Sequence, residues 1–252
     1  MADVVLGIET SCDETSAALL VSDRPGRAPE LASLVILSQD VHRVFGGVVP
    51  ELASRAHLAA LPAIVQRALA EAGLGWSAVD AVAVTQGPGL VGALLVGVVY
   101  AKALAYAGDR ALIGVHHMEG HLFAPAVEHP DLAPPFVALL VSGGHTLLLD
   151  VLVTKLERAV RATGRHTAVL GGGVACSRTL TGRAAERLAG LARVVVASPR
   201  LNADNAAMIA RAGWHRLALG ERSDWTIDAR ADLPLPGLDP VVIPPSTIRN
   251  PQ

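Results

Sequence analysis

Val4-Val-Leu-Gly-Ile-Glu9 is an apolar run, Thr10-Ser-Cys-Asp-Glu-Thr15 is a short polar turn, and Ser16-Ala-Ala-Leu-Leu-Val21 is apolar again. Runs of this length that are rich in Val, Ile and Leu and bounded by small polar residues are typical of strands. The stretch therefore predicts a strand, a tight loop and a second strand that pair as a hairpin.

A second stretch of the same design lies near the middle of the chain. Val137–Val141 is apolar, Ser142-Gly-Gly-His-Thr146 is a polar loop, and Leu147–Val151 is apolar again. We expect Leu147–Val151 to be the return strand of a second hairpin. One hairpin then stands at the head of each half of the chain.

A strand, a glycine-rich loop and a helix follow each hairpin. They are Val79–Val84, Gln86–Gly89 and Val91–Ala107 in the first half, and Thr167–Leu170, Gly171–Gly173 and Ser177–Ala192 in the second. The repeated order indicates an internal duplication. It predicts an α/β fold with two lobes, residues 1–132 and 133–252, whose glycine loops line a central cleft. Ligands in such folds bind beyond the carboxyl ends of the strands.

The two halves differ in length. From Thr10 to Gly87 the chain advances 77 positions, whereas from Gly143 to Gly171 it advances 28. The second half therefore has no counterpart of the long insert of the first half, which includes a predicted helix at Pro50–Ala72.

Composition limits the classes of partner and compartment. Of 252 residues, 51% are apolar and 17% charged, and 19 Arg and 2 Lys leave a net charge of −2. Nucleic acid could therefore be bound only through a local basic patch or a basic partner. Two cysteines suit a reducing compartment, and the N-terminus has no signal-peptide pattern. The uncharged stretch Ala81–Ala101 is interrupted by Gly and Pro, which favours strand–turn–helix over a membrane span. We expect a cytoplasmic protein with no membrane partner.

His117 and His121 are candidate metal ligands. At helical spacing they lie on one face, about 6 Å apart, and Asp204 could complete a three-ligand site with positions open for substrate. The alternatives are a hydrogen-bonded histidine pair and a helix N-cap at Asp204. The pattern is not H-E-x-x-H, so no protease base is implied.

Three loops are candidate sites for phosphate or carboxylate oxygens: Ser142–Gly144, Gly171–Gly173 and the Thr10–Thr15 turn. Glycine lets backbone N–H groups approach such oxygens closely. Neither a Walker lysine loop nor a G-x-G-x-x-G motif is present. Arginines at 158, 161, 165, 178, 183 and 187 could face phosphate, although solvated helix faces are the simpler explanation. Cys12 and Cys176 are interpreted as small loop residues.

Taken together, the motifs resemble the TsaD family of tRNA N6-adenosine threonylcarbamoyltransferases, bacterial branch. The matching blocks, in family order, are Gly7–Thr15, Gly46–His57, Gln86–Leu90, His116–His121, Leu140–Thr146 and Asp204–Ala210. The resemblance implies a duplicated ribonuclease H-like fold, that of the actin and sugar-kinase superfold. It also implies transfer of threonylcarbamoyl from threonylcarbamoyl-AMP to N6 of adenosine 37 in tRNAs that read ANN codons, which is t6A synthesis.

The resemblance assigns roles by position. His117, His121 and Asp204 correspond to the ligands of one divalent metal, Fe²⁺ in the family, with Zn²⁺ as the alternative. The substrate-binding positions would be Leu140, Val141, Ser142, Gly143, Gly144 and Ser177. No catalytic base is identified. The implied partners are tRNA, a TsaB-like subunit on the Pro50–Ala72 region, and a TsaE-like ATPase.

Two departures from the family pattern bear on function. Asp150-Val151 runs directly into Leu152, where the family has a subdomain-sized stretch that contacts the adenylate. Ser177 stands where the family has asparagine. Either residues of the natural protein are missing here, which the intact motifs favour, or the chain is a defective paralogue. Two rival functions follow: a non-catalytic TsaB-like scaffold, and an ATPase or kinase of the same superfold.

Overall fold

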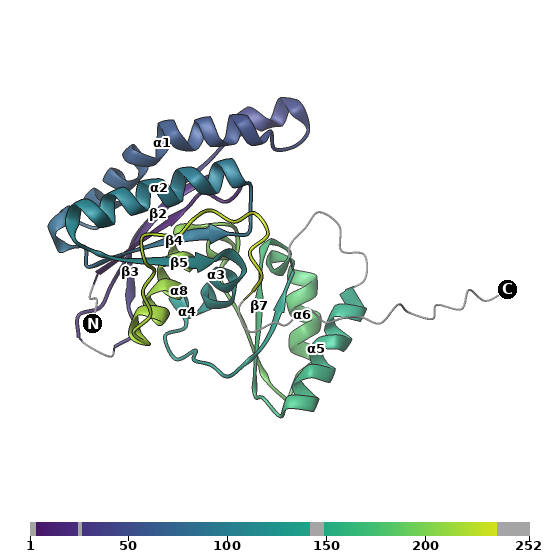
Figure 1. Ribbon diagram of the computed structural model, residues 1–252. Coiled ribbons are helices and arrows are strands. Elements are labelled where there is room, and N and C mark those ends of the chain that lie inside the picture. Colours follow the sequence, from purple (N-terminus) through teal and green to yellow (C-terminus); the bar gives the residue numbers. More distant parts are fainter. Residues whose placement is uncertain (1–3, 25–26, 142–148, 236–252) are drawn as a thin grey trace.

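The computed structural model describes residues 4–24, 27–141 and 149–235, and their strands form two sheets (Figure 1). The strands are β1 Val4–Glu9, β2 Glu14–Val21, β3 Glu30–Ser38, β4 Ala81–Gly87, β5 Ala111–His116, β6 Val137–Leu140, β7 Thr167–Gly171 and β8 Arg193–Val196. The helices are α1 Pro50–Glu71, α2 Val91–Gly108, α3 His117–Phe123, α4 Pro125–Glu128, α5 Leu149–Thr163, α6 Arg178–Arg187, α7 Pro199–Asn202 and α8 Ala206–Ala218. The predicted α/β class is confirmed.

The first sheet has five strands in the order β3-β2-β1-β4-β5. β1 pairs antiparallel with β2, in a register that sets Gly7 opposite Ala18, so the first predicted hairpin is confirmed. β4 and β5 continue the sheet parallel to β1. Every residue of β1 is buried, because helices cover both faces of this sheet.

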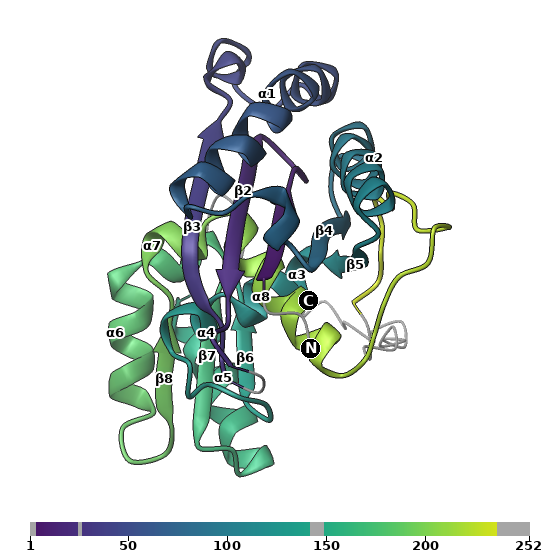
Figure 2. The same cartoon turned by 90° about the vertical axis from the view of Figure 1, so that its left-hand side faces the viewer.

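Helices α1 and α2 cover one face of the five-stranded sheet and α8 covers the other (Figures 1 and 2). α8 packs very close to β1, since a Cβ added at Gly7 would lie 2.2 Å from the carbonyl oxygen of Ala206. Only glycine allows this approach.

α2 has the length and apolar composition of a helix that could cross a membrane. In the structure its residues Val98, Ala101 and Ala105 are buried in the core beneath the sheet. The stretch Ala81–Ala101 thus forms the predicted strand, turn and helix.

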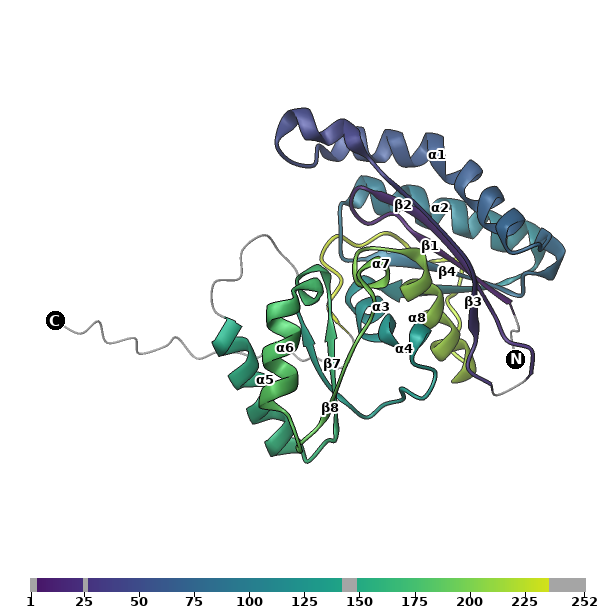
Figure 3. The same ribbon diagram turned by 180° about the vertical axis from the view of Figure 1, so that it is seen from behind.

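The second sheet has three parallel strands in the order β6-β7-β8. Its outer face packs on α5 and α6 through a core that includes Leu156, Leu170 and Leu180. Its other face contributes Val169 and Val195 to a small cluster with residues at and after α4. Seen from behind, α3, α7 and α8 lie between the two sheets (Figure 3).

The predicted return strand Leu147–Val151 is wrong where it can be examined. Residues 142–148 lie outside the described ranges, and Leu149–Val151 opens helix α5. The helix buries Val153, Leu156 and Val160, a spacing of three and four residues that favours a helix over a strand. Among the described residues the second half has counterparts of β1, β4 and β5 but none of β2 and β3.

The segment after α8 returns along the edge of the first sheet (Figure 2). Ser223 N–H donates to Leu112 O at 2.8 Å, and Arg230 N–H donates to Gln86 O at 2.9 Å. α8 and this segment therefore pack with the first sheet although they follow the second in sequence. The domain boundary at residue 132 stays a prediction.

Candidate metal centre

Strand β5 and helix α3 position the two candidate histidines. His116 ends the strand and caps the helix, because its Nδ1 accepts a hydrogen bond from Met118 N–H at 3.1 Å. Its Nε2 donates to Leu233 O at 2.8 Å. His117 and His121 then follow one turn apart and face the same side, as the sequence predicted.

Asp204 reaches the same point from the loop between α7 and α8. The N-cap of α8 is Asn205, whose Oδ1 accepts from Met208 N–H at 3.1 Å. The Asn205 amide also donates to Leu201 O at 2.9 Å and to Ala203 O at 2.7 Å. Because Asn205 holds the loop, the Asp204 side chain is free to point at the histidines, and the N-cap alternative for Asp204 does not hold.

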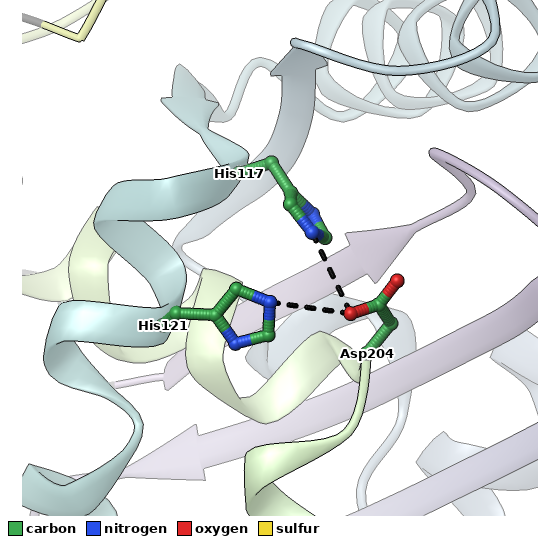
Figure 4. A group of neighbouring side chains, drawn as sticks. All are labelled: His117, His121 and Asp204. Atoms are coloured by element: carbon green, nitrogen blue, oxygen red, sulfur yellow. Dashed lines mark ion pairs between the residues drawn. The ribbon is translucent and has the colours of Figure 1, made fainter. Parts of the chain in front are cut away.

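The three side chains converge (Figure 4). Asp204 Oδ1 lies 3.2 Å from His121 Nε2 and 3.5 Å from His117 Nε2. One potential ligand atom from each residue lies within 4.8 Å of the other two. Ligand atoms of a tetrahedral ion with bonds near 2.1 Å lie roughly 3.4 Å apart, so the donor set fits one divalent metal.

The charge balance of the group also suits a cation. Burial opposes charge on the His117 ring, but the carboxylates of Glu9 and Asp204 outweigh it and raise the pKa of His117 to about 10. Burial likewise opposes charge on Asp204, but the two imidazoles outweigh it and hold its pKa well below the usual range. The ionised carboxylates are thus stabilised by the protonated His117 ring. A bound cation would supply that positive charge in place of the proton.

Groups in the turn between β1 and β2 hold their protons more tightly than usual, because acidic side chains crowd it. Burial and the neighbouring Asp13 and Asp204 raise the pKa of Glu14 to about 8. Burial and the adjoining Asp13 raise the pKa of Cys12 to about 12, so its thiol is not a ready nucleophile. This agrees with the interpretation of Cys12 as a small loop residue.

Sequence reasoning assigned no role to Glu9 and placed Ser11 only in a candidate phosphate-binding turn, yet both reach the His117 ring. Its Nδ1 lies 3.2 Å from Ser11 Oγ and 3.3 Å from Glu9 Oε2. Glu9 is fully buried. A carboxylate at the end of an otherwise apolar strand was the signal that could have pointed to it, because buried carboxylates need partners.

Of the predicted substrate positions, Leu140 and Val141 lie at the end of β6 and Ser177 lies at the start of α6. Leu140 ends β6, and Val141 N–H donates to Gly171 O at 2.9 Å. A Cβ added at Gly171 would lie 2.7 Å from His121 O, so this loop packs directly on the helix of the histidines. Ser142, Gly143 and Gly144 lie outside the described residues.

Ser177 is the N-cap of α6, and its Oγ accepts from Leu180 N–H at 3.4 Å. Its hydroxyl therefore already has a structural partner. Three of the arginines considered for phosphate binding pair with acidic side chains: Arg161 and Arg187 with Glu157, and Arg183 with Asp150. These pairs favour solvated helix faces.

Comparison with known proteins places the chain in a family. Residues 30–151 match the family described as "TsaD: tRNA N6-adenosine threonylcarbamoyltransferase". A relative of that name from Gemmatimonas aurantiaca is 41% identical, with 93% of this chain and 98% of the relative covered. Another from Clostridium perfringens is 56% identical over 149 residues, which are 59% of this chain and 42% of the relative.

The alignment with the Gemmatimonas relative also fits a missing segment. It runs over 352 positions, and this chain has 252 residues, so at least 100 positions have no residue here. Two solved structures share a broad likeness: YeaZ from Pseudomonas aeruginosa (TM-score 0.47, 18% identity, 88% of this chain and 95% of that one) and ROK hexokinase from Thermus thermophilus (TM-score 0.47, 15% identity, 85% and 99%). From its relatives, this chain belongs to the TsaD family, the tRNA N6-adenosine threonylcarbamoyltransferases of t6A synthesis.

Proposed function

We propose that this chain transfers a threonylcarbamoyl group from threonylcarbamoyl-AMP to N6 of adenosine 37 of tRNA, with one divalent metal held by His117, His121 and Asp204. The convergence of these three side chains is the observation that carries the proposal. Fe²⁺ is the ion that the family resemblance suggests, and a His₂Asp set also accepts Zn²⁺.

The reaction is an acyl transfer. The exocyclic amine of the adenosine attacks the carbamoyl carbon, the bond from that carbon to the phosphate oxygen breaks, AMP leaves, and the amine loses a proton. A bound divalent ion would polarise the carbamoyl group and orient the substrate. His117, His121 and Asp204 leave coordination positions open for substrate, and α3 and the Asn205-capped loop fix their geometry.

The two-lobe arrangement belongs to the same proposal. We place the adenylate between the sheets, with its threonylcarbamoyl end at the metal centre and its phosphate at the loops that follow β6 and β7. The contact of Gly171 with the His121 carbonyl supports this, because it sets the loop that follows β7 beside the proposed metal centre. Adenosine 37 lies in the anticodon loop, where a base can be splayed out without opening a duplex.

A TsaB-like subunit is proposed to bind the outer surface of α1 and α2. A groove of about 390 Å³ runs between these helices, lined by Leu58, Leu61, Pro62, Leu95, Val96, Val99, Tyr100 and Ala103. Leu58 and Val99 are 69% and 55% exposed. An exposed apolar patch of this kind is typical of a protein interface. A TsaE-like ATPase is proposed from the family resemblance alone.

The interface is tested by substituting a charge into the groove. We expect Leu58→Asp and Val99→Asp each to weaken binding of the TsaB-like subunit more than about tenfold, measured by titration calorimetry. Leu219→Asp is the matched control, because Leu219 is 65% exposed at the end of α8, on the other face of the sheet. Equal binding by all three variants would contradict the proposed interface.

The activity is tested by reconstitution with threonylcarbamoyl-AMP, tRNA and the partner subunits, with t6A measured by mass spectrometry. We expect one divalent ion per wild-type chain. Asp204→Ala should weaken metal binding by more than about 100-fold and reduce transfer in parallel. Full metal occupancy together with full transfer in Asp204→Ala would overturn the proposal.

The missing segment favours one alternative, a non-catalytic scaffold that keeps the fold. At least 100 alignment positions are absent, and α5 stands where a return strand was predicted. A scaffold would bind the TsaB-like subunit but give no t6A, either as it stands or after the segment is restored.

A further inference from the structure

The two histidines of the metal centre differ in what their outer nitrogen contacts. Nδ1 of His117 lies 3.3 Å from Glu9 Oε2 and 3.2 Å from Ser11 Oγ. Nδ1 of His121 is buried and has no hydrogen-bond partner among the described residues. One ring therefore has a neighbour that can fix its orientation and its tautomer, and the other relies on packing.

Glu9 is held rigidly at this position. Ser11 N–H donates to its Oε1 at 2.5 Å, and Thr85 Oγ donates to its Oε2 at 2.5 Å. β1 and β4 are parallel neighbours with Ile8 opposite Val84, so the next residues, Glu9 and Thr85, emerge side by side. The carboxylate is thus placed by the register of the central strands, and it cannot swing away without breaking both bonds.

A carboxylate and a hydroxyl act differently on an imidazole. An ionised carboxylate only accepts hydrogen bonds, so it requires the proton on the nitrogen that faces it, whereas the Ser11 hydroxyl can donate or accept. With its proton on Nδ1, the His117 ring presents the lone pair of Nε2, and Nε2 faces Asp204 Oδ1 at 3.5 Å. A carboxylate behind a ligating histidine also raises the basicity of the ring.

We propose that Glu9 is a positioning residue for His117: its buried carboxylate accepts the Nδ1 proton and presents Nε2 to the ion that His121 and Asp204 share. The inference rests on the proposed metal centre. Glu9 also supplies the second negative charge, so that with Asp204 it balances a divalent cation in a buried site.

The test replaces the carboxylate by its isosteric amide. In Glu9→Gln the amide oxygen is required by Ser11 N–H, which turns the NH₂ group toward His117 and favours the wrong tautomer. We expect the Kd for Zn²⁺, measured by chelator competition at one fixed pH, to rise about 10- to 100-fold. Glu119→Gln is the matched control, because Glu119 lies on the same helix as the histidines but pairs with Arg216 at 3.3 Å. Its Kd should stay within about twofold.

A spectroscopic measurement separates positioning from a general loss of structure. In the Zn²⁺-loaded wild-type protein, ¹⁵N NMR should show His117 protonated at Nδ1, with the strongly deshielded proton of a bond to carboxylate. In Glu9→Gln that proton should lose its downfield shift while the backbone spectrum away from the site is preserved. The wild-type spectrum decides the question even if the variant does not fold.

The outcomes distinguish this inference from the proposal on which it rests. No Zn²⁺ binding by the wild-type chain would overturn the metal centre itself. Wild-type binding with an unchanged Kd in Glu9→Gln, or with His117 ligating through Nδ1, would overturn the role of Glu9 and leave the metal centre standing.

Discussion

Each of the two sheets contains three neighbouring parallel strands, but in the described part of the chain only the first sheet also has an antiparallel pair beside them. β1, β4 and β5 of the first sheet correspond to β6, β7 and β8 of the second, and each set carries a glycine loop followed by a helix. The first sheet adds β2 and β3 and is covered on both faces. The candidate ligand Asp204 lies just before α8, which packs on the first sheet, whereas Leu140, one of the predicted substrate positions, ends a strand of the second. Metal binding and substrate binding should therefore respond differently to the missing segment.

The largest expected effect comes from restoring that segment. Inserting the corresponding residues of the Gemmatimonas relative after Val151, where the family match ends, should raise the rate of t6A formation above that of the chain without the segment. The Zn²⁺ Kd should change less than about twofold, because the ligands lie outside the inserted region. A glycine-serine insert of equal length is the control. Equal activity with the glycine-serine insert would contradict the expectation that the segment supplies specific substrate contacts.

A cavity in the core of the first sheet should destabilise more of the molecule than a cavity in the core of the second. Leu6 in β1 and Leu170 in β7 are both fully buried, and truncation of a buried leucine to alanine costs about 2 to 5 kcal/mol. Leu6→Ala should lower the free energy of global unfolding. Leu170→Ala should first weaken hydrogen-exchange protection of β6–β8 while β1–β5 stay protected. Uniform loss of protection in both variants would show that the sheets unfold as one unit.

The contact between the second sheet and the metal helix can be tested at one loop. A Cβ at Gly171 would lie 2.7 Å from His121 O, whereas a Cβ at Gly173 would meet nothing within 4 Å. Gly171→Ala should cost about 1 to 3 kcal/mol by overpacking and weaken Zn²⁺ binding. Gly173→Ala should change neither quantity appreciably. Denaturant titrations and Zn²⁺ titrations of the two variants provide the comparison.

The sequence predicted the elements of the first half of the chain better than those of the second. The first hairpin, α1, α2 and the helical spacing of His117 and His121 followed from local pattern. The return strand at Leu147–Val151 did not, because apolar runs of that length suit a strand or the start of a helix equally well. Glu9 was missed for another reason: its role depends on the strand register that sets it beside Thr85, and on the packing of α3 above it.

The smallest expected effect concerns acid stability. Burial lowers the pKa of His57 from 6.5, against the opposing bond to Cys12 O. Because the unfolded chain then binds more protons, stability should fall as the pH drops below about 6.5, by at most about 1.4 kcal/mol per pH unit for this proton. His57→Gln should flatten the dependence of Tm on pH between 7 and 5.5.

The packing of α8 on β1 has a consequence for synthesis on the ribosome. Gly7 meets Ala206, which is 199 positions later in the chain. At about 5 to 20 residues per second, α8 is synthesised roughly 10 to 40 s after β1. During that time the apolar face of the first sheet that α8 will cover is exposed. Asp204 emerges just before α8. The proposed metal centre can therefore be completed only late in synthesis, and until then the uncovered apolar face is open to chaperones.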